Sequence, residues 1–162
     1  MDFDPSGDDY TMTANGTDAY ITFLGRDGNH LQAINWGGDS AVYPRSVCLT
    51  SDYEIAVSGY YFGEGNFNPQ GTDIIPSFGQ QDCFVTEFSI ALLRYQWTSA
   101  WGSYSFDDCT KIAATADGGI VTTGYYQFTV DFDPGAGEAD KTSNGSADIY
   151  TIKLDSSGEL DN

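Results

Sequence analysis

The sequence predicts an all-β fold made of about two and a half tandem repeats. Three observations lead to this prediction. The tetrapeptide Asx-Phe-Asx-Pro stands at residues 2–5, 66–69 and 131–134, so it recurs after 64 and then 65 residues. Polar and apolar residues alternate with a period of two inside each repeat, and turn residues separate the short runs. No stretch shows a helical periodicity long enough to compete with these strands.

The first strand of each repeat is DAYITFL at residues 18–24, DCFVTEF at 82–88 and DIYTIKL at 148–154. Alternation places every second side chain on one face of the strand. These side chains are Tyr20, Thr22 and Leu24 in the first copy, Phe84, Thr86 and Phe88 in the second, and Tyr150, Ile152 and Leu154 in the third. The reversals RDGN and DSSGE follow the first and third copies and predict tight turns. Residues 89–94, SIALLR, replace this turn in the middle copy and are locally ambiguous.

Three further strands complete each repeat. The second ends at Trp36 or Trp101, and the third lies around SVCLT or KIAAT. The fourth is EIAVSGYY or GIVTTGYY, which the third reaches across the turns SDYE and ADGG. Each repeat is therefore expected to be a four-stranded antiparallel meander, and the segment with the tetrapeptide forms a longer connection after it.

Tandem four-stranded meanders are expected to stack as blades of β-propeller type, because one small sheet cannot bury both of its faces. The repeats are predicted over residues 1–65 and 66–130, with a partial third repeat over 131–162. Together they form one repeat domain.

Other markers keep the same period and carry a family resemblance. WGGDS at residues 36–40 matches WGSYS at 101–105, and SGYY at 58–61 matches TGYY at 123–126. With DAYITFLGRDGN, these segments resemble the bacterial SBBP β-propeller repeat. The resemblance implies a propeller fold and an extracellular or cell-surface bacterial protein, and it assigns no biochemical activity.

The charge balance excludes several classes of partner. The chain has 24 Asp and Glu against six Lys and Arg, for a formal net charge of −18. This charge repels nucleic acid and anionic membrane surfaces, and no run of 18 apolar residues predicts membrane insertion. Divalent cations, basic partners and solubility remain as explanations of the acidic surface.

The tetrapeptide segments are candidate calcium sites, since Ca²⁺ takes six to eight oxygen ligands in irregular loops. The candidate ligands are Asp131, Asp133, Glu138 and Asp140 in the last copy, Asp2, Asp4, Asp8 and Asp9 in the first, and Asn66, Asn68 and Asp73 in the middle copy, where weaker binding is expected. The alternative interpretation is that the Asx residues build Asx-turns while Phe3, Phe67 and Phe132 anchor the connection. We favour the turns.

No enzyme signature is present in the sequence. A single histidine, the absence of GxSxG and of a phosphate loop, and the lack of Cys/His pairing leave only carboxylate pairs as catalytic candidates. Asp107 with Asp108, or Asp8 with Asp9, would qualify by residue type, but such pairs usually form a solvated acidic face. We therefore expect no catalytic residues and no enzymatic activity.

Aromatic residues suggest a ligand-binding surface for a glycan or a protein. Tyr60 and Tyr125 recur at equivalent positions, and Trp36 and Trp101 offer rings for stacking. Adjacent tyrosines in a strand point to opposite faces, so at most one residue of each Tyr-Tyr pair can serve such a surface. Core packing between blades is the favoured explanation of the other tyrosine, or of both.

The expected function is that of a structural or adhesive module that self-associates or belongs to a longer array or filament. A carbohydrate-binding or protein-binding propeller is the alternative. The edge of DIYTIKL is expected to be uncovered, which favours pairing with neighbouring repeats or another chain.

Four further features leave alternatives open. Cys48 and Cys83 lie in apolar runs, which favours buried thiols, whereas Cys109 follows two aspartates and is a candidate for the surface. A disulfide bond between Cys83 and Cys109 is possible, but it requires that the two residues lie at a suitable distance and orientation. Asn15 and Asn144 stand in NGT and NGS, which are glycan acceptor sequons as well as Asn-Gly turns.

Overall fold

The computed structural model describes residues 1–91 and 94–161, and the described part is all-β with no helix. The ambiguous segment at residues 89–94 lies partly outside the described residues, since 92 and 93 are not among them. The strands are β1 (Ala19–Leu24), β2 (His30–Trp36), β3 (Val42–Leu49), β4 (Glu54–Tyr61), β5 (Glu64–Asn66), β6 (Ile74–Pro76), β7 (Asp82–Ser89), β8 (Arg94–Trp101), β9 (Asp108–Ala114), β10 (Ile120–Tyr126), β11 (Thr129–Asp131), β12 (Asp140–Thr142) and β13 (Asp148–Leu154). The all-β prediction is confirmed. Because the described part forms no helix, it contains none that is long and apolar enough to cross a membrane.

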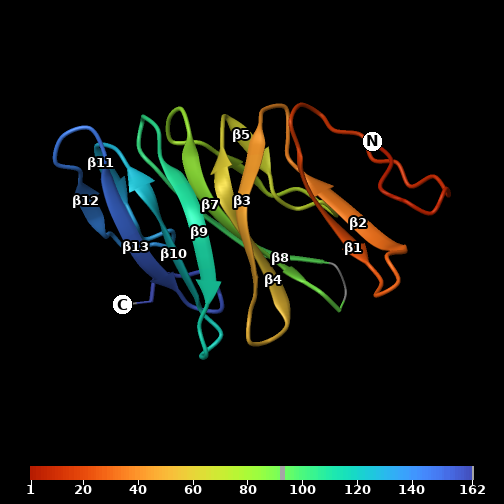
Figure 1. Cartoon of the computed structure of the whole chain (residues 1–162). Coiled ribbons are helices and arrows are strands. Elements are labelled where there is room, and N and C mark those ends of the chain that lie inside the picture. Colours follow the sequence, from red (N-terminus) through yellow and green to blue (C-terminus); the bar gives the residue numbers. More distant parts are fainter. Residues whose placement is uncertain (92–93, 162) are drawn as a thin grey trace.

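Three main antiparallel sheets follow one another along the molecule (Figure 1). A two-stranded sheet, β1–β2, lies at the N-terminal side. The central sheet has the order β3-β4-β7-β8, and a three-stranded sheet with the order β13-β10-β9 lies at the C-terminal side. Two small hairpins, β5–β6 and β11–β12, belong to the connections within the second and third sheets.

The expected grouping of strands into sheets is wrong. The meander was expected to join DAYITFL to EIAVSGYY in one sheet, but β1 pairs with β2 while β3 and β4 belong to the central sheet. The tetrapeptide segment therefore lies inside a sheet connection, between β4 and β7 and again between β10 and β13. The regular register from Glu54–Ser89 to Tyr61–Asp82 holds β4 and β7 together along their full length.

The central sheet is covered on both faces. All eight residues of β7 are buried, although Asp82, Thr86, Glu87 and Ser89 are polar or charged. One cluster joins its first face to the β1–β2 sheet and contains Ala19, Ile34, Trp36, Val42, Ile55, Val57, Tyr61, Phe67, Phe84 and Phe88. The other joins its second face to the three-stranded sheet and contains Ala56, Cys83, Val85, Trp101, Cys109, Ile112, Ile120, Tyr126, Val130, Phe132, Tyr150 and Leu154. The predicted alternation along β7 is confirmed, since Phe84 and Phe88 share one cluster while Cys83 and Val85 share the other.

The outer faces and edges of the terminal sheets carry exposed apolar side chains. Among the described strands, β13 pairs only with β10, and β1 pairs only with β2. An isolated bridge from Leu154 to Leu160 covers one end of β13. Ile149 on β13 is 87% exposed, and Tyr20 on β1 is half exposed. The predicted uncovered edge of DIYTIKL is thus present over most of its length.

Short turns lie at one end of the sheets and long connections at the other (Figure 1). In the described residues, the short turns after β1, β3, β9 and β13 each close with a hydrogen bond between residues three apart, as from the Gly118 N–H to the Thr115 carbonyl. The residue at the left-handed position of these turns is Gly28, Gly118 or Gly158, but Tyr53 (φ 61°) occupies it in the turn between β3 and β4. We call these the turn end and the loop end.

Candidate binding surface

The tetrapeptide segment builds the same pair of Asx-turns three times. In the last copy the Asp131 carboxylate accepts the N–H of Asp133 at 3.0 Å and that of Ala139 at 2.8 Å. The Asp133 carboxylate accepts the Gly135 N–H at 2.8 Å. The equivalent acceptors are Asp2 and Asp4 in the first copy and Asn66 and Asn68 in the middle copy. The turn interpretation is confirmed.

The phenylalanine of each tetrapeptide anchors its segment to the adjacent strand. Phe67 and Phe132 are buried, and their rings lie 5.0 Å from those of Phe84 and Tyr150. Phe3 contacts Tyr20 in the same manner at 4.8 Å. Asp and Asn are interchangeable in the turns because the backbone N–H groups need only a side-chain oxygen acceptor.

The candidate calcium ligands are held mainly as turn acceptors. Among the described residues, no group of three or more His, Cys, Asp or Glu side chains is arranged to hold a metal ion. The carboxylate of Glu159 reaches Gly135 beside Asp133, a neighbour that sequence reasoning missed because Glu159 is remote in the chain. Calcium binding remains a prediction. The other candidates, Asp8, Asp9, Glu138 and Asp140, are exposed, and Asp73 accepts a hydrogen bond from the Tyr95 hydroxyl.

Buried carboxyl groups lie near the loop end, where β7 and β9 begin. Asp82 is fully buried, and it accepts the N–H groups of Phe78 and Gly79 while its other oxygen has no hydrogen-bond partner. Burial raises its pKa to about 7, and the Asp107 carboxyl adds to the increase. Because Asp82 is inaccessible, its raised pKa does not make it a catalytic candidate. The absence of enzymatic activity remains a prediction.

Asp107 connects two loops at this end. One carboxylate oxygen accepts the Ser103 N–H at 2.6 Å and the Ser103 hydroxyl at 2.8 Å, and the other accepts the Gln127 N–H at 2.8 Å. Burial raises the pKa of Asp107. Its neighbour Asp108 lies 3.4 Å from the Arg45 guanidinium. This pair of acids is therefore structural and buried, and the expectation that it forms a solvated acidic face is wrong.

A third loop is joined to the same assembly. The Gln81 N–H donates to the Ser105 carbonyl at 3.0 Å, and the Asp107 N–H donates to the Gln81 carbonyl at 2.8 Å. Gly79 lies so close to the backbone of Tyr104 that a Cβ at this position would overlap it. The loops at residues 77–82, 102–107 and 126–129 are thus fixed relative to one another.

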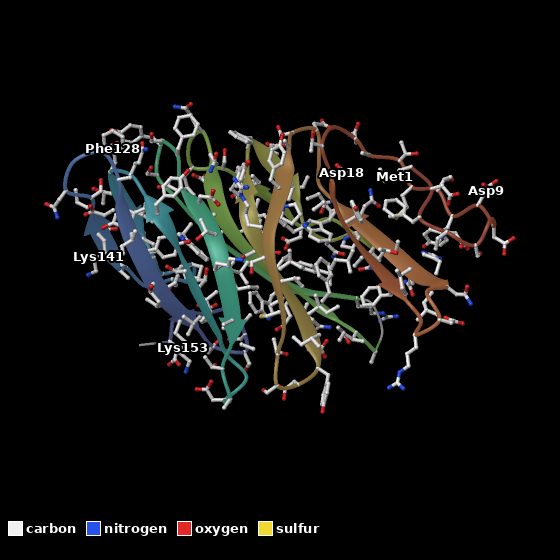
Figure 2. The ribbon with its side chains drawn as sticks, in the orientation of Figure 1. Met1, Asp9, Asp18, Phe128, Lys141 and Lys153 are labelled. Atoms are coloured by element: carbon white, nitrogen blue, oxygen red, sulfur yellow. The ribbon has the colours of Figure 1, made fainter. Side chains whose placement is uncertain are left out.

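These three loops present exposed aromatic rings, which we call the aromatic surface: Phe78, Tyr104 and Phe128. Phe78 is 64% exposed, Tyr104 63% and Phe128 44%. The Tyr104 and Phe128 rings lie 4.3 Å apart with an angle of 34° between them. Figure 2 shows Phe128 at the same end of the molecule as Asp18, opposite Lys153. Sequence reasoning missed these residues, because their positions in the chain do not reveal that the loops meet.

Phe128 also has an unusual backbone conformation. Its φ is 58°, in the left-handed region, and the equivalent position of the preceding repeat is Gly63 with a φ of 61°. A residue other than glycine held in this backbone conformation lowers the stability of the folded state by about 1–3 kcal/mol. The backbone is held there by Ser143, whose hydroxyl accepts the Phe128 N–H and whose N–H donates to the Phe128 carbonyl, both at 2.8 Å.

The predicted ligand-binding residues divide into two groups. Trp36 is 2% exposed and Trp101 is 1% exposed, so their rings pack between the sheets and are not available for stacking. Tyr60 and Tyr125 are partly exposed, whereas Tyr61 and Tyr126 are buried in the two clusters. The prediction that only one residue of each tyrosine pair can reach a surface is confirmed. Tyr60 stacks on Tyr43 at 5.0 Å and lies beneath Arg45.

The cysteines and sequons have separate outcomes. All three thiols are free, and Cys83 and Cys109 are fully buried, so the candidate surface position of Cys109 is wrong. Cys109 contacts the Thr122 hydroxyl at 2.7 Å, and the Tyr150 hydroxyl donates to Cys83 at 3.5 Å. Asn15 and Asn144 are exposed and precede Gly16 and Gly145, both at positive φ, which agrees with Asn-Gly turns.

No protein-family model matches the chain, and no curated protein matches it significantly.

Proposed function

We propose that the chain is a non-enzymatic structural or adhesive module of β-propeller type, which acts outside the cell through neighbouring repeats or further copies of itself. The observation that carries the proposal is the covering of the central sheet on both faces by equivalent sheets. Each sheet of such a stack needs a neighbour, because a small sheet cannot bury both faces alone.

The terminal sheets support the proposal through their exposed residues. Phe3 and Tyr20 form on the N-terminal sheet the same ring pair that Phe67 and Phe84 form inside the molecule. Tyr20 is half exposed, whereas Phe84 is buried by the adjacent sheet. Ile149 is exposed on the opposite terminal sheet. These are the surfaces that a neighbouring blade would cover, and the resemblance to SBBP repeats supports the extracellular location.

Sedimentation velocity at micromolar concentration tests the proposal. We expect the chain to associate, and we expect Ile149→Asp to reduce this association because a charge on the outer face opposes burial. Ile74→Asp is the matched control, since Ile74 is an exposed isoleucine on β6, in the connection between β4 and β7 and not on an outer face of a terminal sheet. A stable monomer of 17.6 kDa at all concentrations would contradict the proposal.

A carbohydrate-binding role is a second candidate, and it rests on the aromatic surface at the loop end. Calcium would be a stabilising ion at the Asp131 and Asp133 turn in either case, with the remaining carboxylate oxygens as ligands.

A further inference from the structure

The structure points to a binding site for a neutral polysaccharide on the aromatic surface formed by Phe78, Tyr104 and Phe128. This inference rests on the second candidate function and names its ligand class, and it does not depend on the proposed self-association, because the surface lies on the loops rather than on the outer faces of the terminal sheets.

Phe128 is retained in a backbone conformation that suits glycine. The preceding repeat places Gly63 at the same position with nearly the same φ. The ring packs on Tyr104 at 4.3 Å, but Tyr104 is itself 63% exposed and Phe128 44%, so this contact does not bury the pair. A side chain kept in a strained and exposed position indicates that the ring has a use at the surface.

The loops that form the aromatic surface carry little charge. The loop segments at residues 74–81, 102–106, 127–130 and 141–147 contain no Asp or Glu, and Lys141 is their one charged residue. The whole chain has 24 acidic residues. The loops that carry the rings therefore offer no carboxylate of their own to a cationic ligand, although exposed Glu64 lies opposite Pro76 at their margin, and this favours a neutral ligand.

Hydroxyl and amide groups surround the aromatic rings. The Ser105 hydroxyl donates to the Gln127 side-chain oxygen at 2.7 Å, which orients the Gln127 amide. The hydroxyls of Thr129 and Thr142 lie 2.8 Å apart and are exposed. Aromatic faces pack against the C–H faces of sugar rings, while hydroxyl and amide groups exchange hydrogen bonds with sugar hydroxyls.

The loops that carry the aromatic surface are fixed relative to one another by hydrogen bonds. The buried Asp107 carboxylate joins the Tyr104 loop to the Phe128 loop, and the Gln81 backbone joins the Phe78 loop to the Tyr104 loop. Rings fixed before binding lose little conformational freedom when a ligand stacks on them. The open, multi-ring arrangement suits several residues of a chain rather than one small molecule in a closed pocket.

Native affinity electrophoresis tests the inference with four neutral polysaccharides, namely galactomannan, xyloglucan, laminarin and dextran, in separate gels. We expect at least one of them to retard the chain, and polygalacturonate to retard it less. Phe128→Gly is expected to weaken the retardation at least about tenfold, as for truncation of a central aromatic contact. Its melting temperature should stay the same or increase, because glycine relieves the left-handed conformation.

Tyr53→Gly is the matched control. In the described part of the chain, Tyr53 and Phe128 are the two non-glycine residues with a positive φ. Tyr53 is exposed and lies at the turn end, away from the aromatic surface. Its replacement makes the same chemical change and gives the same backbone relief without affecting the aromatic surface. Equal binding by the wild type and Phe128→Gly, equal losses in Phe128→Gly and Tyr53→Gly, or no retardation by any neutral polysaccharide would each overturn the inference.

Discussion

Replacement of Glu87 by glutamine should remove a pH-dependent loss of stability from the central sheet. Glu87 lies on β7, is 6% exposed, and accepts a hydrogen bond from the Trp97 indole at 3.1 Å. Burial raises its pKa from 4.5 to about 7, and the nearby carboxylates of Glu54 and Asp52 add to the increase. The folded protein therefore binds this proton more tightly than the unfolded chain does.

The sign of the effect follows from this difference in pKa. The contribution of Glu87 to stability is complete below pH 4.5 and is lost as the pH rises through about 7. The difference corresponds to a loss of at most about 3 kcal/mol by pH 8. Glutamine keeps an oxygen acceptor for the Trp97 indole but carries no charge. Glu87→Gln should therefore be more stable than the wild type at pH 8, by about 1–3 kcal/mol, with little or no gain at pH 4.5.

Urea denaturation of both proteins at pH 4.5, 6 and 8 measures this effect as the free energy of unfolding. Asp82 also has a pKa raised to about 7 by burial, so the wild type should lose stability over the same range and the variant should lose less. Glu64→Gln is the control, because Glu64 is exposed on β5. An unchanged pH dependence in Glu87→Gln, or the same change in Glu64→Gln, would refute the reasoning.

Two further predictions concern the core and the turns. Phe84→Ala removes a fully buried ring that contacts Tyr61 and Phe67, so the free energy of unfolding in guanidinium chloride should fall by about 3–5 kcal/mol. Phe84→Leu should lose less, and an alanine variant as stable as the wild type would contradict the described packing. Millimolar calcium added to EDTA-treated protein should raise the melting temperature, and Asp131→Asn should reduce the rise because it removes a charged ligand while keeping the turn acceptor. The absence of any shift in the wild type would end the calcium proposal.

The local structure of this chain was largely predictable from its sequence. Alternation identified the strands that begin at Asp82 and Asp148, because side chains on a strand point to opposite faces in turn. The same rule predicted that at most one tyrosine of each pair can reach a common surface, and Tyr61 and Tyr126 are buried while Tyr60 and Tyr125 are partly buried. The tetrapeptide predicted Asx-turns, since the hydrogen bonds of such turns join residues close together in the chain.

The grouping of strands into sheets was decided by the tertiary structure. A repeating series of strands can be divided at any of its connections without changing its period, so the sequence period alone does not show which strands pair. The division after Trp36 lets β4 pair with β7 and buries both faces of the central sheet. It also places the tetrapeptide segment in the connection between two strands of the same sheet, where Phe67 and Phe132 reach the core.

The sequence by itself determined the repeat, the strands, the local turns and the acidic character, because each depends on neighbouring residues or on composition. The tertiary structure alone decided that Trp36 and Trp101 are buried and that the loops bearing Phe78, Tyr104 and Phe128 meet. Phe78 and Tyr104 are 26 residues apart in the chain, and Tyr104 and Phe128 are 24 apart. Their meeting depends on the stacking of two sheets and on hydrogen bonds to buried Asp107, and contacts of that range leave no periodic signal in the sequence.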